Sequence, residues 1–371
     1  MISKSVDFLL ENAGPVIQYR LRKEILKDLT KNEEENLLDQ IYQLPHFQLV
    51  ESYVKPNGYI GSGMHSWDKW RGQVLHETPL QDGEAAARLL SYYAIPKEHS
   101  IIEGYVNALR NEEILKKEFS YIPPEIPRFE NRYLGLNNGG GLMVLIYACQ
   151  ALMGHGDDED VKPFVETSYK AFESLLHINR LEDITAFNSN SKKKYNCPYI
   201  EQDVYFPCQY HLETLAHTES WRNDERIKRI VKAINYHDKI MKDSNSIAIK
   251  IGSKYYGPLW AYVAPFKAFE ANKVGDVAQR KTLTHLAMVG GDKIDVVRKS
   301  ADAIKESLAE DGILRIDFES SYQKRRFKEG LKYPGPYTEV ALESNYKKDT
   351  AIWCDLTFWA VQLLHIIEER S

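Results

Sequence analysis

Three acidic residues near the end of the chain have the types and spacing that acid–base chemistry needs. Glu339 and Glu343 lie four residues apart, and Asp355 follows inside an apolar run. The glutamates precede an expected helix start, where the helix dipole favours negative charge. Two carboxyl groups with different pKa values supply an acid and a base, as glycoside hydrolysis requires. These three residues are the candidate catalytic carboxylates, and capping or solvated charge is the alternative.

The densest cluster of titratable residues forms a second candidate. It begins with His65 and Asp68, and it continues with His76, Glu77, Asp82 and Glu84. Histidines and carboxylates bind metals or exchange protons when they converge. The spacings match no metalloenzyme motif, so we assign no metal and the cofactor is unknown. His65 and Asp68 are candidate catalytic residues, and a role as turn and cap residues is the alternative.

Aromatic side chains gather at the starts of several expected helices. Such rings stack on sugars or stabilise a cation, although packing in the core is the alternative. His211 joins them as a polar residue on an expected helix; it lies six residues from His217, a spacing that does not place both on one face. The candidate ligand-binding residues are Trp67, Trp70, Tyr133, His211, Tyr255, Tyr256, Trp260 and Trp353.

The composition is that of a globular protein with a large core. Of 371 residues, 43 % are hydrophobic and 11 % are aromatic. The 48 basic and 53 acidic residues give a formal net charge of -5, so no basic field indicates nucleic-acid binding. Composition does not shift along the chain, so we expect a single domain spanning residues 1–371.

The cysteines and the apolar runs indicate the cellular compartment of the protein. None of the four cysteines forms a C-x-x-C pair, and Cys149 and Cys354 lie in apolar runs. This pattern is typical of a reducing compartment. The first residues contain no signal-peptide core, and no run reaches the ~20 apolar residues of a membrane span. We therefore expect a cytoplasmic protein without a membrane span.

These candidates must be positioned by helices. Residues 350–365 are apolar almost all the way round, as is typical of a helix buried on every side. Similar apolar segments follow Gly- and aromatic-rich turns at residues 142–152, 206–217 and 259–269. Amphipathic helices are expected at residues 15–29, 34–54, 101–109, 158–176, 223–240 and 292–308, and a small-residue helix at 79–93. The strand signal at residues 246–252 is short and fits a lone hairpin arm.

The alternation of apolar and amphipathic helices indicates a repeat architecture. It recurs roughly every 50–60 residues, as in helix-pair repeats. The sequence therefore predicts an all-α fold, an (α/α) toroid or barrel of about five to six helix pairs. The apolar helices would lie inside and the amphipathic helices would ring them.

Several motifs support that architecture. They include Gly58-Tyr-Ile-Gly61 with His65, Pro207-Cys-Gln-Tyr-His-Leu-Glu-Thr-Leu-Ala216 with Trp221, and Cys354-Asp-Leu-Thr-Phe-Trp359. With them the chain resembles the α/α-toroid superfamily of prenyltransferases and squalene/terpene cyclases, in particular an uncharacterised bacterial branch with prenyltransferase-like repeats. The resemblance implies a central cavity for a small amphipathic ligand.

Two departures limit what the resemblance carries over. The Asp-x-Asp-Asp acid motif of class II terpene cyclases is missing from the sequence. The zinc-binding Asp-x-Cys of the protein prenyltransferases is replaced by adjacent residues in reverse order, Cys354 and Asp355. These two residues therefore do not transfer as a zinc pair.

Three hypotheses for function follow. The first is a ligand binder or enzyme whose aromatic cavity holds a small amphipathic, isoprenoid-like molecule. The second is a carbohydrate-active (α/α)6 hydrolase or lyase that uses paired carboxylates. The third is a non-catalytic scaffold whose rim binds a protein partner.

Overall fold

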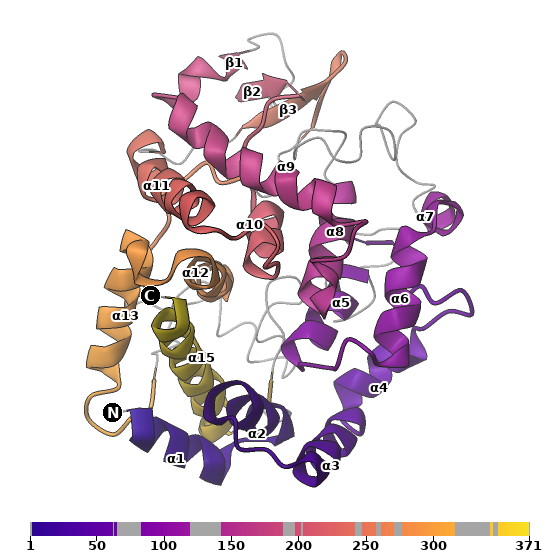
Figure 1. Ribbon diagram of the computed structural model, residues 1–371, viewed down its shortest axis with the longest axis vertical. Helices are drawn as coiled ribbons and strands as arrows, with labels where there is room; N and C mark the ends of the chain where they lie inside the picture. The colour runs from indigo at the N-terminus through magenta and orange to yellow at the C-terminus, as the bar shows by residue number, and fades with distance from the viewer. Residues whose placement is uncertain are drawn as a thin grey trace. The chain divides into compact units, whose positions relative to one another are not determined.

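The computed structural model describes most of the chain as helices in two compact units. It describes residues 2–61, 63–64, 83–118, 142–187, 197–201, 203–241, 247–256, 261–270, 277–315, 342–343 and 348–370. The first unit comprises residues 1–105 and 268–371, and the second comprises residues 106–267. Of the described residues, 67 % are helical (Figure 1). The prediction of a mostly helical protein is confirmed, and a small sheet adds to it.

The N-terminal part of the first unit is a series of short helices. Its elements are α1 (Ile2–Asn12), α2 (Pro15–Arg20), a π-helical turn (Leu21–Leu26), α3 (Lys31–Tyr42), α4 (Pro45–Ser52), α5 (Gly83–Tyr92) and α6 (Ser100–Arg110), which crosses the boundary at residue 105. Thr30 begins α3 through a capping box with Glu33. The helix predicted over residues 34–54 is two helices, because Pro45 begins a new one.

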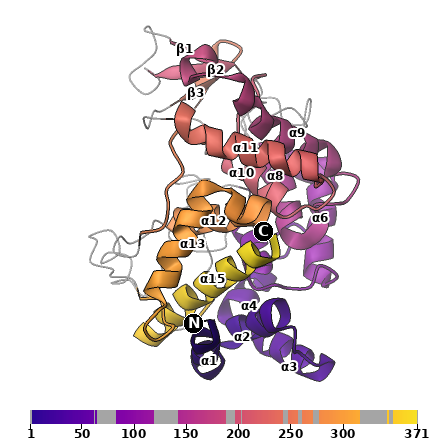
Figure 2. The same ribbon diagram turned by 60° about the vertical axis from the view of Figure 1, so that its left-hand side comes forward.

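The C-terminal part of the first unit contains α12 (Val277–Gly290), α13 (Asp295–Ser307) and α15 (Asp349–Arg370). Helix α15 packs against α12 and α1 (Figures 1 and 2). The Ser5 hydroxyl in α1 donates a hydrogen bond to the carbonyl of Gly312, 2.6 Å away. A Cβ atom on Gly312 would lie 2.8 Å from atoms of Lys4 and Ser5, so this close approach requires glycine. The two ends of the chain thus build one unit.

Helix α15 confirms the predicted buried helix and extends it to Arg370. Its residues Thr350–Arg370 are long and apolar enough to cross a membrane by length and composition alone, and 72 % of the most apolar stretch is buried inside the protein. A core helix of a soluble protein passes the same test. The expectation of no membrane span therefore stays a prediction.

The second unit places apolar helices beside an amphipathic one. Its helices are α7 (Glu112–Glu118), α8 (Leu142–Gln150), α9 (Lys162–Glu173), α10 (Gln209–Ala216) and α11 (Asp224–Ile240). Every residue of α10 is buried, and α10 packs against α8 and α9. Helix α11 begins at Asn223, whose side chain accepts a hydrogen bond from the Arg226 amide, and it buries only one face.

A four-stranded sheet also belongs to the second unit. The strands run in the order β1 (Ala186–Phe187), β2 (Pro198–Glu201), β3 (Ala248–Ile251) and β4 (Lys254–Tyr256). The outer pairs are antiparallel, and β2 and β3 are parallel. The predicted strand at residues 246–252 is present, but it pairs on both sides. Tyr255 and Tyr256 lie in β4, so the prediction that they begin a helix is wrong.

Two further segments differ from the expectation. Residues 261–269, predicted as an apolar helix, contain no helix. Ala261 instead forms a bridge with Cys208, and the Tyr262 amide donates to the Pro207 carbonyl at 3.1 Å. Pro265 cannot donate the hydrogen bond that a helix interior needs, which accounts for the missing helix. Conversely, α12 was not predicted at all.

Candidate functional site

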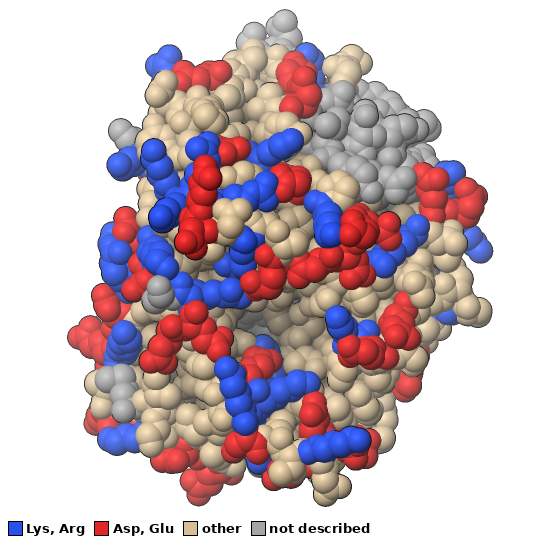
Figure 3. Space-filling view, viewed as in Figure 1, with Lys and Arg blue, Asp and Glu red and all other residues tan. Residues whose placement is uncertain are grey.

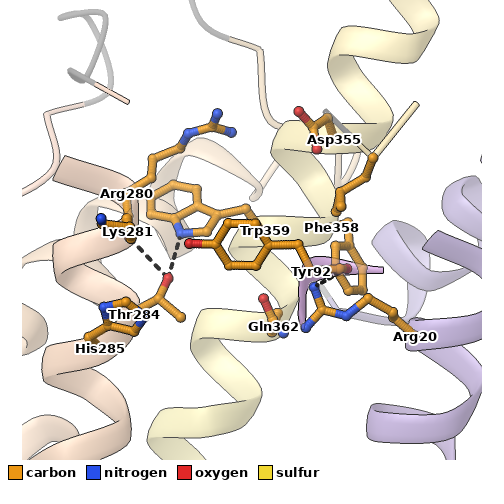
Figure 4. Close-up of a pocket in the computed structure, with 11 residues that line it drawn as sticks. Arg20, Tyr92, Arg280, Lys281, Thr284, His285, Asp355, Phe358, Trp359 and Gln362 are labelled. Atoms are coloured by element: carbon orange, nitrogen blue, oxygen red, sulfur yellow. Dashed lines mark hydrogen bonds between the residues drawn. The ribbon is translucent and has the colours of Figure 1, made fainter. Parts of the chain in front are cut away.

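A pocket in the first unit lies between α12 and α15 (Figure 4). It contains about 480 Å³ of space, which includes the part open to solvent. Its walls come from α15 (Asp355, Phe358, Trp359, Gln362), from α12 (Arg280, Lys281, Thr284, His285), and from Arg20, Tyr92 and Leu342.

Helical spacing explains why these side chains share the pocket. The four α15 residues lie at positions i, i+3, i+4 and i+7, which form one face of a helix. The four α12 residues lie at i, i+1, i+4 and i+5, which also form one face. Two neighbouring helices therefore turn their polar and aromatic faces toward the same space.

Trp359 is the central aromatic residue of the pocket. Its indole Nε1 donates a hydrogen bond to the Thr284 hydroxyl at 3.0 Å, and that hydroxyl donates to the Arg280 carbonyl at 2.9 Å. The Phe269 ring packs edge-on against the indole, with 5.5 Å between ring centroids. These contacts fix the ring, so Trp359 offers a rigid apolar surface to a ligand.

The α12 side of the pocket is cationic. Arg280 is 5 % exposed and Lys281 is 3 % exposed, and His285 lies beside them. The Arg280 guanidinium stands over the Trp359 ring, 5.9 Å from its centroid. The α12 wall therefore brings positive charge close to the aromatic surface of Trp359.

Arg20 is also at the pocket, but its hydrogen bonds tie it to the wall. Its guanidinium pairs with Glu24 at 2.7 Å and donates to the Tyr92 carbonyl at 3.2 Å. It stands 5.2 Å from the centroid of the Phe358 ring. Gln362 donates to the same Glu24 carboxylate at 3.0 Å. Arg20 therefore holds α2, α5 and α15 together at this side of the pocket.

Two carboxyl groups come together beside the pocket. Asp355 lines it and is 4 % exposed, and Glu343 is 9 % exposed. The Gly14 amide donates a hydrogen bond to Glu343 Oε1 at 2.7 Å. A Cβ atom at Gly14 would lie 2.9 Å from Glu343 Oε2, so glycine leaves room for the carboxyl group.

The environment of Glu343 makes its carboxyl group harder to ionise than an exposed glutamate. Burial raises the pKa of Glu343 to about 7, the Gly14 hydrogen bond opposes that rise, and the negative charge of Asp355 adds to it. Burial and the same two carboxylates also raise the pKa of Tyr93 well above its ordinary value and that of the Cys354 thiol to about 12. Glu343, Tyr93 and Cys354 are therefore each harder to ionise here than they are in water.

The structure brings two of the sequence-predicted residues together, Glu343 and Asp355. Their electrostatic interaction is the arrangement expected of paired carboxylates. Seven other candidates lie outside the described residues: Glu339, His65, Asp68, Trp67, Trp70, Tyr133 and Trp260.

The remaining candidates are not among the residues that line this pocket. Trp353 is in α15, where the Arg315 guanidinium stands 4.9 Å from its ring centroid, and it does not line the pocket. Tyr255 packs edge-on against Tyr199 in the sheet of the second unit. His211 is fully buried in α10, where burial lowers its pKa to about 3, so it is a neutral imidazole near pH 7.

Sequence reasoning missed the cationic wall, Arg280 and Lys281. The signal was weak but present, because Leu283, Leu286 and Ala287 follow at helical spacing and are buried. That pattern predicts a helix on which Lys281 lies opposite the apolar residues and Arg280 lies at the edge of their face. It does not show whether these two residues meet water or a pocket.

In the described part of the chain, no three His, Cys, Asp or Glu residues gather as metal ligands. Comparisons with models of protein families, with curated proteins and with solved structures found no match.

Proposed function

We propose that this protein binds a small amphipathic anion in the pocket between α12 and α15. The main support is that one pocket combines a cationic wall, formed by Arg280 and Lys281, with the fixed aromatic surface of Trp359. Phe358 and Leu342 add apolar surface. A carboxylate or phosphate would meet the cations while the apolar part packs on the rings. An isoprenoid-like molecule with an anionic group is one such ligand.

The α/α toroid stays part of this proposal. Helix α5 from Gly83 to Leu90 and all of α10 are buried, and α15 buries most of its length, as inner helices of a ring would. Charges of both signs are interspersed on the face that Figure 3 shows, which does not favour a polyanionic partner.

Three probes separate the anionic head from the apolar tail. Hexyl phosphate carries both, inorganic phosphate carries only the head, and 1-hexanol carries only the tail. We expect isothermal titration calorimetry to detect hexyl phosphate binding that is at least ten times tighter than either partial probe. Arg280→Met should weaken hexyl phosphate binding by about tenfold or more, because it removes a charge-assisted contact.

Arg298→Met is the matched control, since Arg298 is an exposed arginine on α13 that pairs with Asp295. It should leave hexyl phosphate binding unchanged. Lys281→Met provides a second variant if Arg280→Met does not fold. Equal binding of hexyl phosphate and 1-hexanol, or normal binding in both pocket variants, would contradict the proposed function.

A second candidate function, carbohydrate hydrolysis, is favoured by the pairing of Glu343 with Asp355. Glu343 would donate a proton to the leaving oxygen, and Asp355 would act as base or nucleophile. Reducing-end release from a panel of soluble oligosaccharides tests it. We expect the rate to fall as pH rises through about 7, where Glu343 loses its proton. Glu343→Gln should lower the rate by about 10²–10⁴-fold, and absence of release across the panel would contradict this candidate.

No comparable observation favours the scaffold hypothesis. Among the described residues the exposed large apolar side chains are Ile2, Leu10 and Phe187. Such single side chains are ordinary on a protein surface.

A further inference from the structure

Gln362 presents a hydrogen-bond acceptor to the pocket. It lies on α15 three residues beyond Trp359, on the same helix face, and its side chain is partly exposed. Its amide nitrogen Nε2 donates a hydrogen bond to Glu24 Oε2 at 3.0 Å. Within the described part of the chain, its amide oxygen Oε1 accepts no hydrogen bond. This oxygen therefore remains able to accept a hydrogen bond from a ligand.

The pairing of Arg20 with Glu24 sets the orientation of that amide. Arg20 donates from Nε to Glu24 Oε1 at 2.7 Å and from Nη2 to Glu24 Oε2 at 3.0 Å, so both glutamate oxygens act as acceptors. An amide turned the other way would set the Gln362 oxygen against Glu24 Oε2, with no proton between two acceptors. The nitrogen therefore faces Glu24, and Figure 4 shows the oxygen of Gln362 on the side of the Trp359 ring.

The polar groups nearest to the ring have already used their hydrogens. The indole N–H of Trp359 donates to the Thr284 hydroxyl at 3.0 Å, and the hydroxyl hydrogen of Thr284 goes to the Arg280 carbonyl at 2.9 Å. Each of these two groups has a single hydrogen to donate. A ligand that lies on Trp359 therefore meets the acceptor of Gln362 without gaining a donor from Trp359 or Thr284.

A ligand that covers Trp359 also reaches Gln362, because three residues of an α-helix rise only about 4.5 Å. It then excludes water from the amide oxygen. A hydrocarbon or an ether offers no hydrogen in return, and an acceptor that is buried without a donor costs free energy. A hydroxyl or an amide N–H supplies the hydrogen. Sites that hydrogen-bond a hydroxyl reject analogues that lack it.

We propose that the ligand of this pocket carries a neutral hydrogen-bond donor, a hydroxyl or an amide N–H, and that Gln362 selects for it. This inference rests on the proposed function, because it assumes that an amphipathic anion occupies the pocket. The anionic group lies at the α12 wall, the apolar part packs on Trp359, and the donor reaches Gln362 Oε1. The ligand class is therefore a hydroxylated or amide-bearing amphipathic phosphate or carboxylate.

Alkyl phosphates that differ only at the far end test the proposal on the wild-type protein. The probes are hexyl, 6-hydroxyhexyl and 6-methoxyhexyl phosphate, together with the matching butyl and octyl series, because the spacer length is one of the variables. The methoxy group keeps the oxygen of the hydroxyl group but has no hydrogen to donate. We expect the hydroxyl member of at least one series to bind about tenfold tighter than both of its counterparts, as measured by calorimetry.

Gln362→Met assigns the preference to this residue. Methionine keeps a side chain of similar length and removes the amide. The plain alkyl phosphate should bind the variant at least as tightly as it binds wild type, and the advantage of the hydroxyl probe should disappear. Gln40→Met is the matched control, since Gln40 is an exposed glutamine on α3 whose amide donates to Asn36 at 2.7 Å. It should preserve the hydroxyl preference.

The outcomes separate the inference from the proposed function. Hydroxyl probes that bind wild type no tighter than the methoxy probes in all three series would overturn the donor and leave the amphipathic anion standing. A hydroxyl preference that persists in Gln362→Met would overturn the role of Gln362. No binding of any phosphate to wild type would overturn the proposed function, and the inference with it.

Discussion

Replacing Arg88 with alanine should destabilise the first unit by about 3–5 kcal/mol, the range for breaking a buried ion pair. Arg88 and Glu84 lie four residues apart on α5, and their side chains are 0 % and 1 % exposed. The guanidinium Nη2 and Nε donate to Glu84 Oε1 at 2.6 and 3.0 Å. The variant removes this partner, and the Glu84 carboxylate remains buried.

A double variant distinguishes the cost of leaving Glu84 unpaired from the cost of losing side-chain packing. Glu84→Leu with Arg88→Met replaces both charged side chains by apolar ones of similar length, and it should cost less than Arg88→Ala alone. Guanidinium chloride unfolding followed by circular dichroism measures both. A single variant within about 1 kcal/mol of wild type, or a double variant as unstable as the single one, would show that the pair has another role.

Glu343→Gln should remove a pH dependence of stability worth about 3 kcal/mol in the wild type. The folded protein raises the pKa of Glu343 from 4.5 to about 7, so it binds this proton more tightly than the unfolded chain. The resulting stabilisation is fully present below about pH 4.5 and is lost as pH rises to about 7. Glutamine keeps an acceptor for the Gly14 amide but does not titrate.

The measurement is the difference in unfolding free energy between wild type and Glu343→Gln at several pH values. The variant should gain stability relative to wild type as pH rises from 5 to 8, and the difference should level off above the folded pKa. Other titrating groups cancel in the difference. A difference that stays constant over this range would mean that the carboxyl group of Glu343 is already ionised at pH 5.

The sequence predicted the helices whose apolar periodicity is strong, and it failed where local chemistry overrides hydrophobicity. Residues 350–365 and 223–240 lie in α15 and α11, because a buried helix and an amphipathic helix each have a distinct pattern. Residues 261–269, the described part of the expected inner helix at 259–269, contain no helix, because Pro265 interrupts the hydrogen bonding that a helix needs. The single domain, the toroid and the cytoplasmic location stay predictions.

The sequence predicted the acidic residues of the candidate site but not its basic residues, for a similar reason. Glu343 and Asp355 were found because acidic residues near an apolar helix start are conspicuous. Arg280 and Lys281 were not, because the polar face of an amphipathic helix has the same composition whether it meets water or a pocket. Whether that face meets water or a pocket depends on which helix packs beside it. That helix is α15, whose Trp359 lies 75 residues along the chain from its hydrogen-bond partner Thr284 in α12.

The division of the first unit between the two ends of the chain sets an order for its biosynthesis. Residues 1–105 leave the ribosome before residues 268–371, and α15, against which α1 and α2 pack, follows only after the whole second unit. At ~5–20 residues per second, the N-terminal helices wait roughly 10–50 seconds for this partner. The second unit is continuous and can fold during that interval. The apolar faces of α1 and α2 are meanwhile uncovered, so nascent chains that stall before α15 should be the species that chaperones retain.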